Sequence, residues 1–230
     1  MSSLRVGIVG ATGKMGRFTQ GLLAHEADLE LVCMLGSSDD LASGLTQSGA
    51  QVAVDFTAAG LGAQHGLAML ECGVRPLIGT SGVSEDEDAA LDALARERGL
   101  GGLVVPNFCL GVWLQQRLAR DAARFLPAVE IIEEHHATKK DAPSGTAADT
   151  ANQLARVTGA DEIPVHSVRL PGLYSNQTVV FGGHGEVLRI GHVTYGLDAF
   201  GPGILAGLRY VAGAEGVARG IGLAFESSAP

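Results

Sequence analysis

The residues best suited to chemistry lie in one short stretch, Glu133-Glu-His-His-Ala-Thr-Lys-Lys-Asp-Ala-Pro-Ser-Gly-Thr146. Two adjacent histidines, His135 and His136, precede two lysines, Lys139 and Lys140. Imidazole and ammonium groups can donate protons near neutral pH, and the lysines add positive charge to a chain whose formal net charge is −9. The stretch therefore predicts acid–base chemistry on an anionic substrate.

The end of this stretch favours carboxylate binding. Ser144, Gly145 and Thr146 stand where the N-cap and first turn of an expected helix over 146–157 belong. Backbone N–H groups in the first turn of a helix have no partner within the helix, so they are available to an anion.

Plainer interpretations of the same residues remain open. Adjacent histidines on a strand point to opposite faces, so at most one of the pair is expected in a given pocket. Paired lysines commonly form a solvated face, and a lone histidine is more often a structural hydrogen-bonding group. We expect no metal site, because the lysines repel cations and the three cysteines lie on separate expected elements (Cys33, Cys72 and Cys109).

A second candidate site is the glycine-rich segment Gly10-Ala-Thr-Gly-Lys-Met-Gly16, which follows the apolar run Val6–Val9 and precedes an expected helix over 17–24. Glycines in such a turn let backbone N–H groups approach a pyrophosphate at the helix N-terminus. The spacing is GxxGxxG and not the strict GxGxxG of dinucleotide-binding proteins, so a turn that needs glycine only for packing is the alternative.

The end of the second expected strand, Leu29–Leu35, bears on coenzyme choice. An acidic residue there normally holds the ribose 2′-hydroxyl of NAD, but this chain has Gly36-Ser-Ser38, and Asp39 and Asp40 come late. Because Lys14 lies near the glycine turn, we expect both NADH and NADPH to be used, with NADPH at least as good.

The elements that position these residues alternate between strand and helix through residues 1–106, which predicts a parallel sheet covered on both faces. Ser84 and Glu87 form a capping-box pattern before an expected helix that ends at Gly99. Only 16 residues, 36–51, separate the second and third strands, which leaves little room for a crossover helix. Further strands are expected over 52–55, 77–78 and 103–105, and helices over 61–70 and 85–98.

From residue 107 the pattern changes to helices with antiparallel-type strands, which predicts a second, α+β domain. The segment 203–224 reads as one further helix. The other expected helices cover 112–125 and 146–157, and the strands cover 128–134, 165–170, 178–181 and 186–195.

Composition restricts the class of protein. The chain has 230 residues, 46% hydrophobic and 18% charged, which excludes a disordered protein. Its longest uncharged run, 99–116, contains Gly, Pro, Asn and Gln and is not a membrane span, and the apolar run before Gly10 is too short for a signal peptide. The acidic balance argues against nucleic acid as a partner, and the scattered cysteines favour a reducing, cytoplasmic location.

Four separated segments together resemble the dihydrodipicolinate reductase family, also called 4-hydroxy-tetrahydrodipicolinate reductases. The match from Glu134 to Ala147 is the most specific of them. The other segments are Val9–Arg17, Val54–Thr57, and Ile78–Gly82 together with Pro106–Val112.

The resemblance implies a fold, an assembly and a reaction. It implies an α/β Rossmann-type dinucleotide-binding domain formed by residues 1–106 with 204–230, and an α+β substrate-binding and oligomerisation domain formed by residues 107–203. The chain would form a homotetramer. It would reduce 4-hydroxy-tetrahydrodipicolinate, a cyclic dicarboxylate bound between the domains, to tetrahydrodipicolinate with NADPH or NADH, on the diaminopimelate route to lysine.

The resemblance also implies roles for individual residues. His135 matches the family's acid–base histidine, and Lys139 matches its proton-donating lysine. His136, Ser144, Gly145 and Thr146 would bind the substrate. The cofactor would lie on Gly10, Ala11, Thr12, Gly13, Lys14 and Met15 at one side, and on Gly79, Thr80, Ser81, Val105, Pro106, Asn107 and Phe108 at the nicotinamide side.

Two other functions fit parts of this pattern. Another two-domain NAD(P)-dependent dehydrogenase would share the glycine turn but has no reason to carry the histidine–lysine stretch. A nucleotide-sensing binding protein would use the same turn, yet it should add a basic helix or a partner motif, and none is visible in the sequence.

Overall fold

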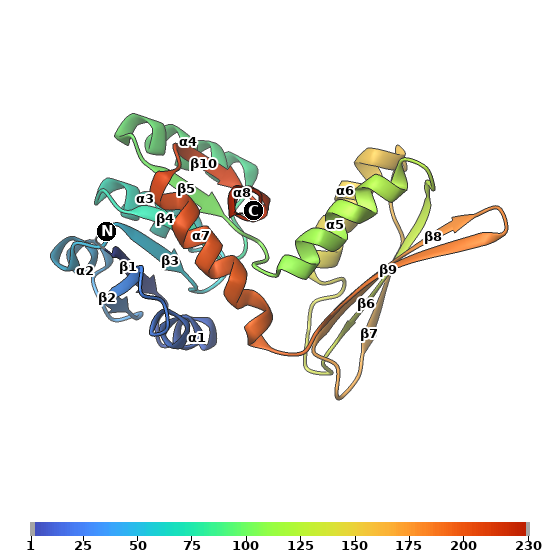
Figure 1. Ribbon diagram of the computed structural model, residues 1–230, viewed down its shortest axis with the longest axis horizontal. Helices are drawn as coiled ribbons and strands as arrows, with labels where there is room; N and C mark the ends of the chain where they lie inside the picture. The colour runs from blue at the N-terminus through green and yellow to red at the C-terminus, as the bar shows by residue number, and fades with distance from the viewer. Residues whose placement is uncertain (1–2, 229–230) are drawn as a thin grey trace. The chain divides into compact units, whose positions relative to one another are not determined.

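The computed structural model describes residues 3–228, which divide into two compact units (Figure 1). One unit runs through Phe108 and resumes at Phe200. The other is the continuous segment Cys109–Ala199.

The first unit is built on a parallel sheet. Among the described residues it has six strands in the order β10-β5-β4-β3-β1-β2. Short runs of buried apolar residues explain these strands, since a parallel sheet with helices packed on it leaves little strand surface for water. The strands are β1 (Leu4–Val9), β2 (Leu29–Leu35), β3 (Val52–Asp55), β4 (Arg75–Ile78), β5 (Gly101–Val104) and β10 (Gly216–Arg219).

Helices connect these strands. In α4 the expected capping box is confirmed: Ser84 accepts a hydrogen bond from the backbone of Glu87, whose carboxylate accepts one from the backbone of Ser84. Helix α7 packs on β3, β4 and β5 and contacts α1 (Figure 1). The helices are α1 (Lys14–Leu23), α2 (Leu41–Ser48), α3 (Gly62–Glu71), α4 (Glu85–Arg98), α7 (Gly201–Gly213) and α8 (Gly222–Ser228).

One expectation about this unit is wrong. The segment 203–224 is not one helix, because α7 ends at Gly213 and strand β10 follows; Gly216 and Gly220, on either side of the strand body, have φ values of +72° and +94°, which a helix does not allow. The segment 36–51, where little room was expected, holds a crossover helix of 8 residues. It is the short α2, which Asp40 caps by accepting a hydrogen bond from the backbone of Ser43 at 2.8 Å.

The second unit is a mixed sheet with two helices on it. The strand order is β7-β6-β8-β9; β6 pairs parallel with β7 and antiparallel with β8, which pairs antiparallel with β9. Ile131, Leu154 and Phe181 belong to its buried core. The elements are α5 (Leu110–Ala123), β6 (Ala128–His135), α6 (Gly145–Thr158), β7 (Val165–Arg169), β8 (Ser175–Gly183), β9 (Glu186–Thr194) and a 3₁₀ turn (Leu197–Phe200).

None of the helices in residues 3–228 is long and apolar enough to cross a lipid bilayer.

At the start of helix α1, the backbone at Gly16 packs closely against the backbone of Gly10 and Ala11. A Cβ atom at Gly16 would overlap the carbonyl oxygen of Gly10 and the Cα of Ala11. Gly21, in the same helix, is exposed, and no described atom lies within 4 Å of a Cβ built there. The third glycine of the turn is therefore needed for close packing.

Replacing Gly16 with Ala should destabilise the protein by about 1–3 kcal/mol, because backbone has to move to admit the methyl group. Gly21→Ala is the matched control and should be neutral or stabilising by roughly 0.5–1 kcal/mol, since alanine favours a helix interior. Calorimetric unfolding of both variants tests this. Equal stability of the two variants would show that the turn tolerates a side chain.

Candidate active site

The centre of the candidate site is the carboxyl end of strand β6. Side chains alternate along a strand, so Glu133 and His135 point to the same face, and both are buried. The carboxylate oxygen Oε2 of Glu133 contacts Nδ1 of His135. Glu133 is 0% exposed, so this carboxylate depends on protein donors alone.

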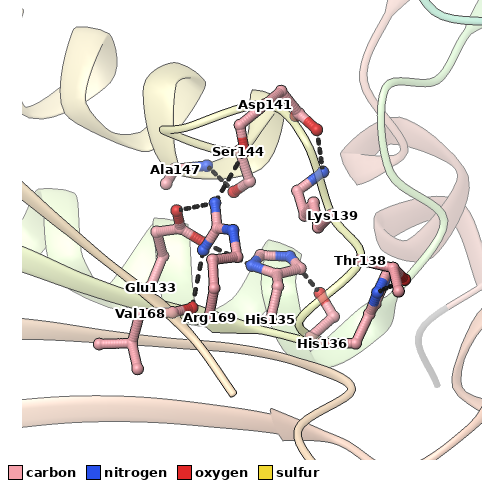
Figure 2. Close-up of polar contacts among 11 residues, drawn as sticks. Glu133, His135, His136, Thr138, Lys139, Asp141, Ser144, Ala147, Val168 and Arg169 are labelled. Atoms are coloured by element: carbon pink, nitrogen blue, oxygen red, sulfur yellow. Dashed lines mark hydrogen bonds and ion pairs between the residues drawn. The ribbon is translucent and has the colours of Figure 1, made fainter. Parts of the chain in front are cut away.

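Arg169, at the end of the neighbouring strand β7, supplies the principal charge that balances Glu133. Its Nη2 donates to Oε1 of Glu133 at 2.7 Å and to the carbonyl oxygen of Asp141 at 2.8 Å. Nη1 donates to the carbonyl oxygen of Val168 at 2.8 Å. Figure 2 shows Arg169 beside Glu133, with contacts that reach the loop after β6.

Ser175 faces the other nitrogen of the imidazole. It opens strand β8 and is the antiparallel partner of His135 in the sheet. Its Oγ lies 3.0 Å from Nε2 of His135. The histidine therefore has a carboxylate on one ring nitrogen and a hydroxyl on the other.

These neighbours shift the ionisation of the pair. Burial favours the neutral form of Glu133, but hydrogen bonds from Arg169, Ser167 and His135 outweigh it and lower the pKa of the carboxyl. Burial also lowers the pKa of His135, and the contact with Glu133 only partly opposes this effect. At neutral pH the arrangement favours a carboxylate next to a neutral imidazole.

The loop between β6 and α6 carries the expected proton donor. Nζ of Lys139 lies 2.8 Å from Oδ1 of Asp141, and its side chain is largely covered (Figure 2). Lys140 is exposed. His136 is also exposed, and its Nδ1 lies 2.7 Å from the hydroxyl of Thr138.

The N-terminus of α6 follows the loop. Ser144 is its N-cap and accepts a hydrogen bond from the backbone of Ala147 at 3.2 Å. Gly145 is exposed, and no described atom lies within 4 Å of a Cβ built there. The first turn is thus open to an anion, which the helix dipole also favours.

In the first unit, the glycine turn borders a cavity of about 390 Å³. Gly10 has φ +82°, and a Cβ there would lie 2.5 Å from the carbonyl oxygen of Phe56, so only glycine fits. The lining residues are Val9, Gly10, Thr12, Gly13, Leu35, Gly36, Ser37, Asp39, Leu41, Phe56, Thr57, Ala58, Leu61 and His65.

This cavity has the composition that a dinucleotide requires. Gly10 and Gly13 bring backbone close to it, α1 begins directly after Gly13, and Val9, Leu35 and Leu41 offer apolar walls. Three residues expected at the cofactor, Ala11, Lys14 and Met15, are not among the lining residues.

The residues expected at the nicotinamide side gather at a different point of the same unit. A Cβ on Gly79 would lie 2.5 Å from the ring of Phe56 and 2.7 Å from that of Phe108; the two rings meet edge to face with centroids 5.5 Å apart. Thr80 donates from its hydroxyl to the buried carboxylate of Asp55 at 2.7 Å. Ser81 and Val105–Phe108 follow β4 and β5, outside the lining of the cavity.

Sequence reasoning missed several of these residues. Glu133 could have been found, because it is two positions before His135 on an expected strand. Arg169 and Ser175 could not, because their approach depends on strand register. Asp39 was judged to come late for the ribose position, yet it lines the cavity, and its carboxylate accepts a hydrogen bond from the backbone of Gly36 at 2.7 Å.

Among residues 3–228, no group of three or more His, Cys, Asp and Glu side chains is arranged to hold a metal ion.

Comparison with known proteins gives matches along both units. The family model described as "Dihydrodipicolinate reductase, N-terminus" matches residues 4–108, and that described as "Dihydrodipicolinate reductase, C-terminus" matches residues 111–221. The 4-hydroxy-tetrahydrodipicolinate reductase of Coxiella burnetii is 40% identical over 224 residues, which cover 91% of this chain and 94% of that protein. The enzyme of the same name from Symbiobacterium thermophilum is 40% identical and covers 92% of this chain and 93% of its own.

Solved protein structures are also similar to this chain. A dipicolinate-bound dihydrodipicolinate reductase from Paenisporosarcina sp. TG-14 has a TM-score of 0.85 and 30% identity, over 95% of this chain and 98% of its own. An amine dehydrogenase from Mycobacterium smegmatis has a TM-score of 0.67 at 14% identity, over 94% of this chain and 95% of its own, and shares the fold alone. This chain belongs to the dihydrodipicolinate reductase family and is an oxidoreductase with a Rossmann-type NAD(P)-binding unit.

Proposed function

We propose that this chain reduces 4-hydroxy-tetrahydrodipicolinate to tetrahydrodipicolinate with NADH or NADPH, on the diaminopimelate route to lysine. The observation that carries the proposal is the grouping of His135, Lys139 and the open first turn of α6 around one loop. The relatives that match 91% and 92% of the chain carry the name of this activity.

The substrate is held by its carboxylates. One carboxylate lies on the first turn of α6, where Ser144, Gly145 and Thr146 offer backbone N–H groups and hydroxyls. His136 contacts the ring or a carboxylate. A relative that binds dipicolinate, a ring with two carboxylates, supports a cyclic dicarboxylate as the ligand.

The cofactor lies on the glycine turn and in the cavity beside it, with its nicotinamide side toward the loops after β4 and β5. When bound, it supplies the hydride. The residues involved are Gly10, Ala11, Thr12, Gly13, Lys14 and Met15 at the turn, and Gly79, Thr80, Ser81, Val105, Pro106, Asn107 and Phe108 at the nicotinamide side.

Lys139 and His135 handle the protons. Loss of the 4-hydroxyl as water turns the substrate into a conjugated imine. Hydride addition to that imine leaves an electron-rich intermediate, which needs a proton at the adjacent carbon. The ammonium group of Lys139 stabilises that intermediate and donates the proton. His135 exchanges protons with the site as its acid–base partner.

Asp39 governs coenzyme preference in this proposal. Its carboxylate lines the cavity next to Gly36, at the position from which acidic residues accept a hydrogen bond from the ribose 2′-hydroxyl. A 2′-phosphate there would meet a like charge, so NADH should bind at least as well as NADPH. This replaces the expectation from sequence, which rested on a missing carboxylate.

The chain works in the cytoplasm as a homotetramer, with residues 1–106 and 204–230 binding the dinucleotide and 107–203 binding the substrate and forming the contacts between subunits. Support comes from large apolar side chains that are exposed on the second unit, among them Ile132, Leu170, Val187, Leu188 and Val193.

Lys139→Ala should lower kcat by about two to four orders of magnitude, because it removes the proton donor. Lys140→Ala, a change of the exposed neighbour, should leave kcat near wild type. Steady-state kinetics by absorbance at 340 nm measures both variants, and dissociation constants for coenzyme should not change. A loss of turnover with Lys140→Ala alone would move the donor by one residue.

Thr146→Ala should raise the KM for substrate by about tenfold, or ~1.4 kcal/mol, with little change in kcat, because a hydrogen bond to a carboxylate is lost in both the ground state and the transition state. Thr158→Ala, the same change at the other end of α6, is the control and should not affect KM. An unchanged KM in both variants would place the carboxylate elsewhere.

Asp39→Asn should lower the dissociation constant of NADPH by about tenfold, because a like charge near the 2′-phosphate is removed. It should raise the dissociation constant of NADH, because the carboxylate that accepts a hydrogen bond from the ribose 2′-hydroxyl is lost. Asp40→Asn removes the same charge one residue along and keeps a side chain that can cap α2, so it should change neither constant. Fluorescence titration of both coenzymes gives the ratio. The same ratio in both variants would exclude Asp39 as the selecting residue.

A further inference from the structure

The mechanism above makes no use of the most deeply buried charge in the site. Glu133 is 0% exposed, and its two carboxylate oxygens are divided between two strands. Oε1 takes the hydrogen bond from Arg169 on β7, and Oε2 meets Nδ1 of His135 on β6 itself. A buried ionised carboxylate is costly unless its partners are all donors. The contact with Glu133 therefore restricts which tautomer the imidazole of His135 can adopt.

The hydrogen-bonding groups around Glu133 determine which ring nitrogen of His135 carries a hydrogen. An arginine only donates hydrogen bonds and an ionised carboxylate only accepts them, so the atom that meets Oε2 has to carry a hydrogen. That atom is Nδ1 of His135. In a neutral imidazole the other nitrogen, Nε2, then has a lone pair, and it accepts a hydrogen bond from the Ser175 hydroxyl 3.0 Å away.

We propose that Glu133 is a positioning residue that, held by Arg169, fixes His135 as the neutral Nδ1–H tautomer, so that this histidine accepts a proton at Nε2 and does not donate one from the resting enzyme. The inference rests on the proposed role of His135 in the reaction. The two groups then have different tasks. Lys139 in the loop gives the proton that follows hydride addition, and His135 at the end of β6 accepts the proton that the carbon next to the imine releases when the 4-hydroxyl leaves as water.

The charges around His135 agree with this division. Glu133 on β6 favours the protonated ring, whereas Arg169 on β7 and Lys139 in the loop disfavour it, as does burial; Asp141 is paired with Lys139. When Nε2 receives a proton, the Nδ1–H bond is kept and the new positive charge lies against the Glu133 carboxylate. The same proton then passes from Nε2 to the departing hydroxyl, which leaves as water, so the histidine returns to its resting form within each turnover.

The chain contains a matched pair for comparison. Glu130 lies on β6 and His166 on β7, and Nε2 of His166 is 2.8 Å from Oε2 of Glu130. Their side chains are 59% and 58% exposed. Water competes for this contact, so it should not hold the His166 ring in one tautomer.

The first test needs no variant. Nitrogen-15 chemical shifts of the histidine rings in the full-length protein distinguish a protonated from an unprotonated ring nitrogen. His135 should show a protonated Nδ1 and an unprotonated Nε2 at neutral pH. His166 should show exchange between its two tautomers. A proton on Nε2 of His135 in the wild-type protein would overturn the proposal.

The second test is Glu133→Gln. Arg169 can only donate, so it should take the amide oxygen and leave the amide NH₂ group facing Nδ1, which then has to be unprotonated. The ring shifts of His135 should therefore switch to the Nε2–H tautomer, and kcat should fall by at least about 100-fold with KM within a factor of about two. Glu130→Gln, the control, should alter neither.

A pH profile adds a readout that a purely structural role would not move. The acid limb of kcat/KM should lie below the ordinary histidine pKa of about 6.5, because activity needs neutral His135 and burial lowers its pKa. Glu133→Gln should move the limb lower still, because the neighbour that favours the protonated ring is lost. An unshifted limb with an unchanged tautomer would overturn the proposal.

Two variants distinguish an error in the role of His135 from an error in the role of Glu133. If His135 has no role in the reaction, His135→Ala keeps wild-type turnover while the wild-type ring still shows the Nδ1–H tautomer. If only the positioning role is wrong, His135→Ala loses turnover, but Glu133→Gln keeps both the tautomer and kcat.

Discussion

A carboxylate withdrawn from water has to be surrounded by hydrogen-bond donors, and one such carboxylate organises each unit of this chain. In the first unit it is Asp55, which is 0% exposed at the end of β3. In the second it is Glu133, near the end of β6. Each lies at or near the carboxyl end of its strand, and each contacts a histidine.

Asp55 joins the loops after β3 and β4 and helix α3 through its partners. It accepts hydrogen bonds from the backbone and hydroxyl of Thr57 at 2.8 and 2.7 Å and from the hydroxyl of Thr80 at 2.7 Å. Nδ1 of His65, which lines the cavity beside the glycine turn, lies 2.8 Å away. The loops after β3 and β4 and the start of α3 are thus fixed to one another by a single buried group.

The local part of this structure could be predicted from the sequence. The capping box at Ser84, the strand–glycine–helix order after β1 and the helix start at Ser144 all depend on residues a few positions apart. The alternation that buries Glu133 and His135 together is equally local. The histidine–lysine loop was recognised because its chemistry is compressed into 14 residues.

What depends on register or on distant partners could not be predicted. Arg169 reaches Glu133 only because β7 pairs in parallel with β6, and no short-range signal states that pairing. Strand β10 was read as helix because Val217 gains its strand partners, and the carboxylate of Asp92 on α4, only in the folded unit. Asp39 reaches the cavity by a turn back onto Gly36, which a simple position count does not anticipate.

The place of β10 in the sheet also has a consequence for how the chain is made. This strand pairs with β5, but more than 100 residues of sequence, including the whole continuous second unit, lie between the two. During synthesis the second unit can therefore close while the first still lacks its edge strand and α7. Until residues 216–219 leave the ribosome, the exposed edge of β5 is a place where a chaperone, or another nascent chain, can pair.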